Sequence, residues 1–206
     1  MRENKTLCGY LHPLSIFLLG LFFFSAGLAQ SPADVPAFVN TPLESKFKFD
    51  VEASVPLEGT FDKWNATLTF TSPDLATGAL NIEIQADSVD TGSGIQNGKL
   101  KGKDFFDVKN NPSITFKSTK IVQTGRDTIE VDGELTLRGV TKHEKLTLKV
   151  TGAGTGSGTI DGTIAFDPKD YGINSGIPPV KIADRVEVNF ALKSKRVSGP
   201  PVVLKP

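Results

Sequence analysis

The residue types that most often carry out catalysis or bind metals are scarce in this chain. Its 206 residues contain one cysteine, Cys8, and two histidines, of which His143 alone lies beyond the N-terminal apolar segment. The sequence GVTKHEKL places His143 at a predicted turn between strands, where nothing in the sequence nominates a partner for general base catalysis or for metal binding. We therefore predict an exposed histidine, no catalytic residues, no metal site and no cofactor.

Carboxylates are numerous but dispersed among predicted loops. The candidates are Asp104, Asp107, Asp167 and Asp170. Solvated charge or turn capping accounts for such residues. The alternative is a hydrolase or isomerase that acts on lipid-like substrates, which would need a buried polar cluster that the sequence does not indicate.

Three lysines, Lys99, Lys101 and Lys103, alternate just before two adjacent aromatic residues, Phe105 and Phe106. A solvated loop is the simpler interpretation of these charges. The alternative is that their ammonium groups bind a pyrophosphate or an anionic lipid headgroup. The two phenylalanines would then form a lid at the mouth of a cavity.

Strands must position these residues, because apolar and polar residues alternate with a period of two through most of the chain after residue 45. The long connection 88–111 interrupts this pattern, and we expect it to contain one short helix. A glycine-rich segment, 151–163, runs from one strand into another, which indicates hairpin glycines and not a phosphate-binding loop. About eight or nine strands predict an all-β protein, either an antiparallel barrel or a sandwich.

The N-terminal segment has the features of an export signal. Arg2 and Lys5 precede an apolar run at 14–24, and small residues follow near Ala29. Because the run is shorter than the roughly 20 residues that span a bilayer, we predict a signal peptide at 1–29 and a periplasmic or secreted protein, with an uncleaved anchor as the alternative. An extended Pro-rich lead, 30–42, precedes the domain, and a loose Pro-rich tail, 198–206, follows it.

Several motifs of this chain occur in the order that is typical of one family. They are DFFDV, PSITFKS, GELTLRGVTK, YGI and ADRVEVNFAL. Together they resemble the YceI-like family, which is described as polyisoprenoid-binding and lipocalin-like. The resemblance implies a YceI-like domain at 43–197 that forms an antiparallel lipocalin-like barrel of about eight strands with one short capping helix.

The resemblance also implies a binding protein, not an enzyme, that holds a long-chain isoprenoid lipid in the barrel lumen for carriage or storage. A polyisoprenoid or an isoprenoid quinone would be bound through burial of methylene groups, at about 0.8 kcal/mol each. The predicted lumen residues are Phe47, Phe49, Phe70, Ile82, Ile84, Phe116, Val131, Leu135, Leu148, Phe166, Val188 and Phe190, with Phe105, Phe106, Lys99, Lys101 and Lys103 at the mouth.

The residues alone leave a second class of function open, a filled β-domain that acts as an interaction module for envelope proteins. Such a module would expose an apolar patch in place of a tunnel. The chain carries 23 basic and 23 acidic residues, so nothing in its charge favours a nucleic acid partner. Transient contact with a membrane and a homodimer are both compatible with either interpretation.

Overall fold

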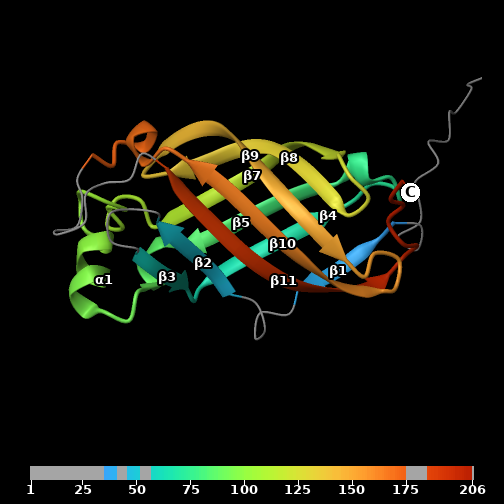
Figure 1. Ribbon diagram of the computed structural model, residues 1–206, viewed down its shortest axis with the longest axis horizontal. Helices are drawn as coiled ribbons and strands as arrows, with labels where there is room; N and C mark the ends of the chain where they lie inside the picture. The colour runs from blue at the N-terminus through green and yellow to red at the C-terminus, as the bar shows by residue number, and fades with distance from the viewer. Residues whose placement is uncertain (1–34, 41–45, 52–56, 175–184, 206) are drawn as a thin grey trace, which may run out of the picture.

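The computed structural model describes residues 35–40, 46–51, 57–174 and 185–205 (Figure 1). The predicted signal peptide, 1–29, lies outside these residues. Within the described part of the chain, no helix has both the length and the apolar character needed to cross a membrane.

Among the described residues, eleven strands form one sheet, which curls around a common interior (Figure 1). The strands are β1 (Ala37–Asn40), β2 (Lys46–Val51), β3 (Leu57–Phe61), β4 (Trp64–Thr69), β5 (Ala79–Gln85), β6 (Val89–Asp90), β7 (Ser113–Gln123), β8 (Thr128–Leu137), β9 (Val140–Thr151), β10 (Ser157–Phe166) and β11 (Val186–Ser198). Their order is β4-β5-β7-β8-β9-β10-β11-β2-β3-β6, and β1 pairs with β11. All of these pairings are antiparallel. The predicted all-β, lipocalin-like architecture is confirmed, with two short strands, β1 and β6, beyond the predicted number.

The longest strand, β11, joins the two ends of the barrel. Near its start it pairs with β2 on one side, and near its end it pairs with β1 on the same side. The order of the described strands does not pair β4 with β1 or β2, and aromatic side chains pack across the space between them. The rings of Phe47 and Trp64 lie 4.8 Å apart, and those of Phe38 and Phe70 lie 5.8 Å apart. Side-chain packing therefore closes the barrel where the strand order places no backbone ladder among the described residues.

One short helix, α1 (Gly94–Lys101), lies at one end of the barrel, while β1 and the C terminus lie at the other (Figure 1). The Ser93 hydroxyl accepts a hydrogen bond from the backbone N–H of Gln96 and so caps the start of α1. Leu100 is buried and turns one face of α1 toward the core. The predicted helix in the long connection is confirmed, and we call this side of the molecule the α1 end.

Three strand glycines lie directly beneath phenylalanine rings on the inner face of the sheet. The pairs are Gly59 with Phe49, Gly133 with Phe116, and Gly162 with Phe190. In these pairs the Cζ atom of the ring lies 2.4, 2.5 and 2.0 Å, respectively, from the position that a Cβ atom on the glycine would occupy. Because Cζ is the atom farthest along the ring, each ring lies flat against the sheet and does not project across the interior.

The two terminal segments are attached to the barrel more closely than the sequence predicted. The predicted lead contains β1, which pairs with β11. In the predicted loose tail, the backbone N–H of Val203 donates to the Pro73 carbonyl at 3.0 Å. The Gln123 side chain both accepts from the Lys205 N–H at 2.8 Å and donates to the Lys205 carbonyl at 2.9 Å. We call residues 199–205 the strap, and the adjacent end of the barrel the strap end.

Candidate functional site

Ten of the twelve predicted lumen residues are buried in one continuous apolar core, and the other two, Phe166 and Val188, are half-buried against it. The ten are Phe47, Phe49, Phe70, Ile82, Ile84, Phe116, Val131, Leu135, Leu148 and Phe190. They come from β2, β5, β7, β8, β9 and β11 and from the end of β4, so they surround the interior from most of its sides. Their contact with a ligand stays a prediction.

The predicted mouth residues all belong to the α1 end. Phe105 and Phe106 are half-buried and pack against the core, where the ring of Phe106 lies 5.8 Å from that of Phe61. Lys99 and Lys103 are exposed, and Lys101 is half-buried. The two rings thus cover this end of the core. Lys99 and Lys101 lie in the last turn of α1, and Lys103 follows it.

The side chain of Arg138 links several loops at the α1 end. It stands in the tight turn between β8 and β9 with φ of 52°, and Gly139 follows with φ of 74°. Its guanidinium donates to the Lys103 carbonyl at 2.8 Å and to the carbonyls of Tyr171 and Gly172. One side chain therefore joins the β8–β9 turn to two separate loops that cross this end of the barrel.

The Tyr171 side chain makes a second stabilising interaction at the α1 end. The residue belongs to the 3₁₀ turn η5 (Pro168–Tyr171) and is 1% exposed, and its ring packs edge-on against that of Phe166. Its hydroxyl donates to Glu144 Oε1 at 2.8 Å. Burial raises the pKa of the Tyr171 hydroxyl, and the hydrogen bond to the Glu144 carboxylate raises it further. Tyr171 therefore remains a neutral donor at physiological pH.

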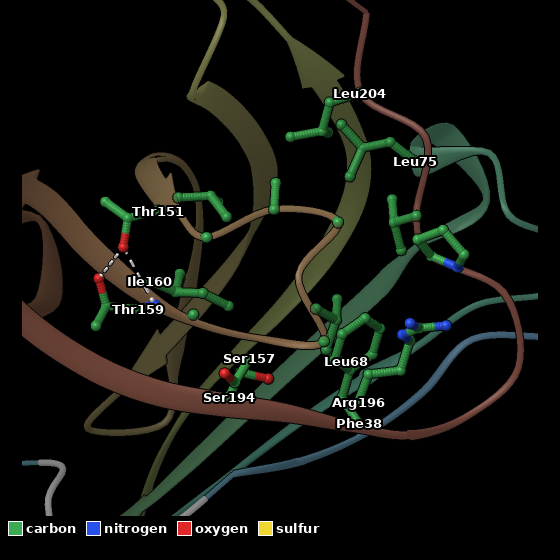
Figure 2. Close-up of a pocket in the computed structure, with 18 of the residues that line it drawn as sticks. Phe38, Leu68, Leu75, Thr151, Ser157, Thr159, Ile160, Ser194, Arg196 and Leu204 are labelled. Atoms are coloured by element: carbon green, nitrogen blue, oxygen red, sulfur yellow. Dashed lines mark hydrogen bonds between the residues drawn. The ribbon is translucent and has the colours of Figure 1, made fainter.

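An apolar pocket lies at the opposite, strap end of the barrel (Figure 2). Its cavity volume is about 100 Å³, and it opens to solvent. It is lined by Phe38, Leu68, Phe70, Leu75, Ile129, Val150, Thr151, Gly152, Ala153, Gly154, Gly156, Ser157, Gly158, Thr159, Ile160, Ser194, Arg196, Pro201, Val202 and Leu204. Of the predicted lumen residues only Phe70 lines this pocket, and none of the predicted mouth residues does.

The glycine-rich hairpin between β9 and β10 forms one wall of the pocket. Gly152, Gly154 and Gly156 have φ values of 69°, 83° and 90°, which few residues other than glycine adopt. The hydroxyls of Thr151 and Thr159 lie 2.5 Å apart where the two strands begin to separate (Figure 2). The prediction that these are hairpin glycines is confirmed, and their lack of side chains makes this wall of the pocket thin.

Two polar residues of β11 also line the pocket. Phe190, Leu192 and Ser194 are buried at alternate positions, and Arg196 continues this inward-facing row. Sequence reasoning ended the strand pattern at Leu192 and so missed Ser194 and Arg196. Extension of the same alternation by four residues would have placed both on the inner face.

The described residues offer no metal centre, since they include no group of three or more histidine, cysteine or acidic side chains that could hold an ion. The His143 side chain is 66% exposed, as predicted, and its Nε2 atom lies 4.0 Å from Asp132 Oδ1. Neither side chain lines the pocket. The described lining of the pocket offers apolar contact, a few hydroxyls and the guanidinium of Arg196.

A curled antiparallel sheet with an apolar interior and a pocket at one end defines a lipocalin-like barrel. The model of the YceI-like domain matches residues 38–194 of this chain. The chain therefore belongs to the YceI-like family, as its motifs indicated.

Relatives and solved structures agree with this assignment. A UPF0312 protein of Yersinia pestis is 34% identical over 94% of this chain and 98% of its own length. The crystal structure of Burkholderia cenocepacia BcnA matches with a TM-score of 0.68 at 28% identity, over 75% of this chain and 99% of that protein. A polyisoprenoid binding domain from Saccharophagus degradans shares the fold, with a TM-score of 0.62 at 17% identity over 78% of this chain and 99% of that domain.

Proposed function

We propose that this protein binds a long apolar lipid, a polyisoprenoid or an isoprenoid quinone, inside its barrel and carries or stores it. The observation that carries the proposal is the pocket at the strap end, whose described lining is mostly aliphatic, aromatic or glycine and reaches the core at Phe70. Removal of apolar ligand surface from water in such a pocket contributes about 25 cal/mol per Å². The polyisoprenoid binding domain of similar fold supports the same ligand class.

The flat phenylalanine rings support the proposal from inside the barrel. A ring that lies over a glycine occupies the layer next to the sheet, so it takes less of the central space than a ring that points across it. Three strands carry this arrangement, β3, β8 and β10. We infer that it leaves a slender apolar chain room to lie along the barrel axis.

We further propose that the protein is exported and acts in the periplasm or outside the cell, as a binding protein without catalytic activity. The support for export is the pattern of the first 29 residues, a basic start, an apolar run and small residues. Because free isoprenoid lipids are poorly soluble in water, a carrier outside the cytoplasm would exchange them with membranes. Cleavage after Ala29 is checked by N-terminal sequencing of the exported protein.

The experiment that tests lipid binding is organic extraction of exported protein purified without detergent, followed by mass spectrometry of the extract. A stoichiometric isoprenoid is the expected result. An empty extract, also after incubation of the protein with quinone and polyprenyl phosphates, would contradict the proposal and favour an interaction module for envelope proteins.

A Phe116→Asp variant tests the position of the ligand in the barrel. Phe116 is 4% exposed and lies flat over Gly133, so a carboxylate there would be buried in apolar surroundings without a partner. We expect loss of folding or of lipid binding, because an unpaired buried charge costs several kcal/mol. If a folded Phe116→Asp protein still yields lipid on extraction, the ligand does not occupy the central part of the barrel.

A further inference from the structure

Ser194 is a buried polar residue of the strap-end pocket whose hydrogen-bonding capacity is unused. The residue is 8% exposed, and its hydroxyl has no hydrogen-bond partner among the described residues. It lies on the inward-facing row of β11, two positions beyond Leu192. A buried hydroxyl without a partner is unfavourable, so this atom gains from any ligand oxygen that reaches it.

Arg196 is the one charged residue among the described residues that line the same pocket. Its guanidinium donates to the Gly199 carbonyl at the start of the strap, and no described carboxylate lies within ion-pair distance of it. Ser194 and Arg196 are two positions apart on one face of β11, a spacing of about 7 Å between Cα atoms, and both line the pocket. An anion that accepts a hydrogen bond of about 2.8 Å from each side bridges such a distance.

We propose that the strap-end pocket binds the anionic head of an amphiphile, a phosphate or a carboxylate, through the Ser194 hydroxyl and the Arg196 guanidinium. The apolar chain of the ligand then lies on Phe38 and Phe70 and runs into the barrel. This inference rests on the proposed function and adds the head chemistry and the end of the barrel where it binds. It moves the polar site from the α1 end, where the sequence predicted lysines, to the strap end.

The polar groups at the α1 end are placed differently. Arg138 already donates to three backbone carbonyls through its terminal nitrogens, and Tyr171 donates to Glu144. The Nε atom of Arg138 is buried without a partner, as the Ser194 hydroxyl is, but Arg138 does not line the pocket. Lys99, in the last turn of α1, and Lys103, just after the helix, are exposed. At the strap end, in contrast, a buried donor and a cation both line an apolar pocket.

The test is isothermal titration of the purified, delipidated protein with geranylgeranyl phosphate, palmitate and geranylgeraniol. We expect Ser194→Ala to weaken binding of geranylgeranyl phosphate about tenfold, as for loss of a hydrogen bond to a charged group. The melting temperature should stay unchanged or rise, because the substitution removes an unpartnered buried hydroxyl. Arg196→Gln should weaken the two anionic probes and leave geranylgeraniol unaffected, and Arg196→Lys should restore part of the loss. The two anionic probes show which head is preferred.

Two controls belong to the α1 end. Ser113→Ala removes a hydroxyl that donates to Glu83 there, and a triple Lys99→Gln, Lys101→Gln, Lys103→Gln variant removes the lysines. Both should bind geranylgeranyl phosphate like the unmodified protein.

If the triple variant loses affinity while the Ser194 and Arg196 variants do not, the head binds at the α1 end and this inference is wrong, while lipid binding stands. If geranylgeraniol binds as tightly as the phosphate and Arg196→Gln changes neither, the anionic head is excluded. If the unmodified protein binds no probe and its extract is empty, the proposed function itself fails.

Discussion

The two ends of the barrel are closed by different kinds of interaction. At the α1 end, the charged side chain of Arg138 donates to carbonyls of two loops, and Phe105 and Phe106 pack beneath them. At the strap end, one wall is a glycine-rich hairpin. The cover is a strap that is bound through backbone groups, the half-buried Gln123 side chain and, at its first residue, the Arg196 guanidinium. Beyond Gly199 the strap is bound through neutral hydrogen bonds. Charge-assisted bonds are stronger than neutral ones, so this part of the strap should open at a lower free energy than the α1 end.

The two ends also differ in their relation to the family. The matched domain, residues 38–194, includes the whole α1 end with Arg138 and Tyr171. It stops at Ser194, so Arg196 and the strap lie beyond it. The cover over the pocket therefore lies outside the matched domain.

Arg138→Ala should give the largest effect and weaken the α1 end selectively. It removes three hydrogen bonds from a charged donor, and we expect the free energy of unfolding to fall by roughly 3 kcal/mol, measured by urea denaturation. Arg138→Asn is the matched control, since asparagine adopts the positive φ of this turn better than arginine or alanine does. If Arg138→Asn is as stable as the unmodified protein, the effect belongs to the turn and the guanidinium does not fasten this end.

Truncation after Pro200 should have a smaller effect on stability and a larger one on ligand exchange. It removes the half-buried Val202 and Leu204 from the pocket and the two hydrogen bonds to Gln123, at a cost of roughly 2 kcal/mol in the free energy of unfolding. Dissociation of a bound lipid, followed by transfer to vesicles, should become at least several-fold faster.

Val203→Ser is the control for the truncation, because Val203 is 64% exposed and its side chain points away from the core. Exchange in this variant should match that of the unmodified protein. A truncated protein that exchanges lipid no faster would mean that the ligand leaves through the α1 end, and the contrast between the two ends would be reversed.

Tyr171→Phe isolates one bond at the α1 end. The ring and its contact with Phe166 are kept, and only the hydrogen bond to Glu144 is lost, so the free energy of unfolding should fall by about 1 kcal/mol. Glu144→Gln keeps an acceptor for the hydroxyl and should lose less. Equal losses in both variants would show that the charge of Glu144, and not the hydrogen bond itself, accounts for the stability.

The sequence predicted the fold well because the fold depends on a repeated pattern. Strands such as β5 and β8 bury one face and expose the other, so their residues alternate in a way that a single sequence reveals. β6 has only two residues and β1 only four, and such lengths are too short for an alternation to be recognised. The strap was missed for a different reason, since its bonds to Pro73 and Gln123 use its backbone and leave no pattern in its side chains.

The pocket lies at the strap end, whereas the sequence predicted a mouth near residue 100. The lysines and paired phenylalanines near residue 100 suggested a mouth there, because charge next to aromatic residues is visible in a sequence. The pocket at the strap end combines Phe38, a glycine hairpin and the strap, which come from distant parts of the chain and meet only through the antiparallel register of β1, β10 and β11. The role of Arg138 could not be predicted from the sequence either, because its hydrogen bonds go to loops that fold back over its turn.

The smallest predicted effect is a response to pH, which we expect at the α1 end and not at the strap end. Asp90 accepts hydrogen bonds from the Asn97 side chain at 3.0 Å and from the Gly92 N–H at 2.9 Å, next to the start of α1. These two bonds, the Asn97 bond first, hold the pKa of Asp90 below its usual value. Because the folded pKa is the lower one, this stabilisation is complete above the unfolded pKa of about 3.9 and is lost as the pH falls through the folded value.

Acidification should therefore loosen the start of α1 before it affects the strap. The amide of Thr91, which donates to Asn97 Oδ1 at 2.8 Å, should show faster hydrogen exchange, corrected for intrinsic rates, as the pH falls below about 4. The strap amides of Val203 and Lys205 donate to a carbonyl and to an amide oxygen, neither of which titrates, so their protection should not change over the same range. In Asp90→Asn the response of Thr91 should disappear. Equal acid sensitivity at both ends would mean that acid unfolds the barrel as a whole, because two independently closed ends cannot respond together to the titration of one carboxylate.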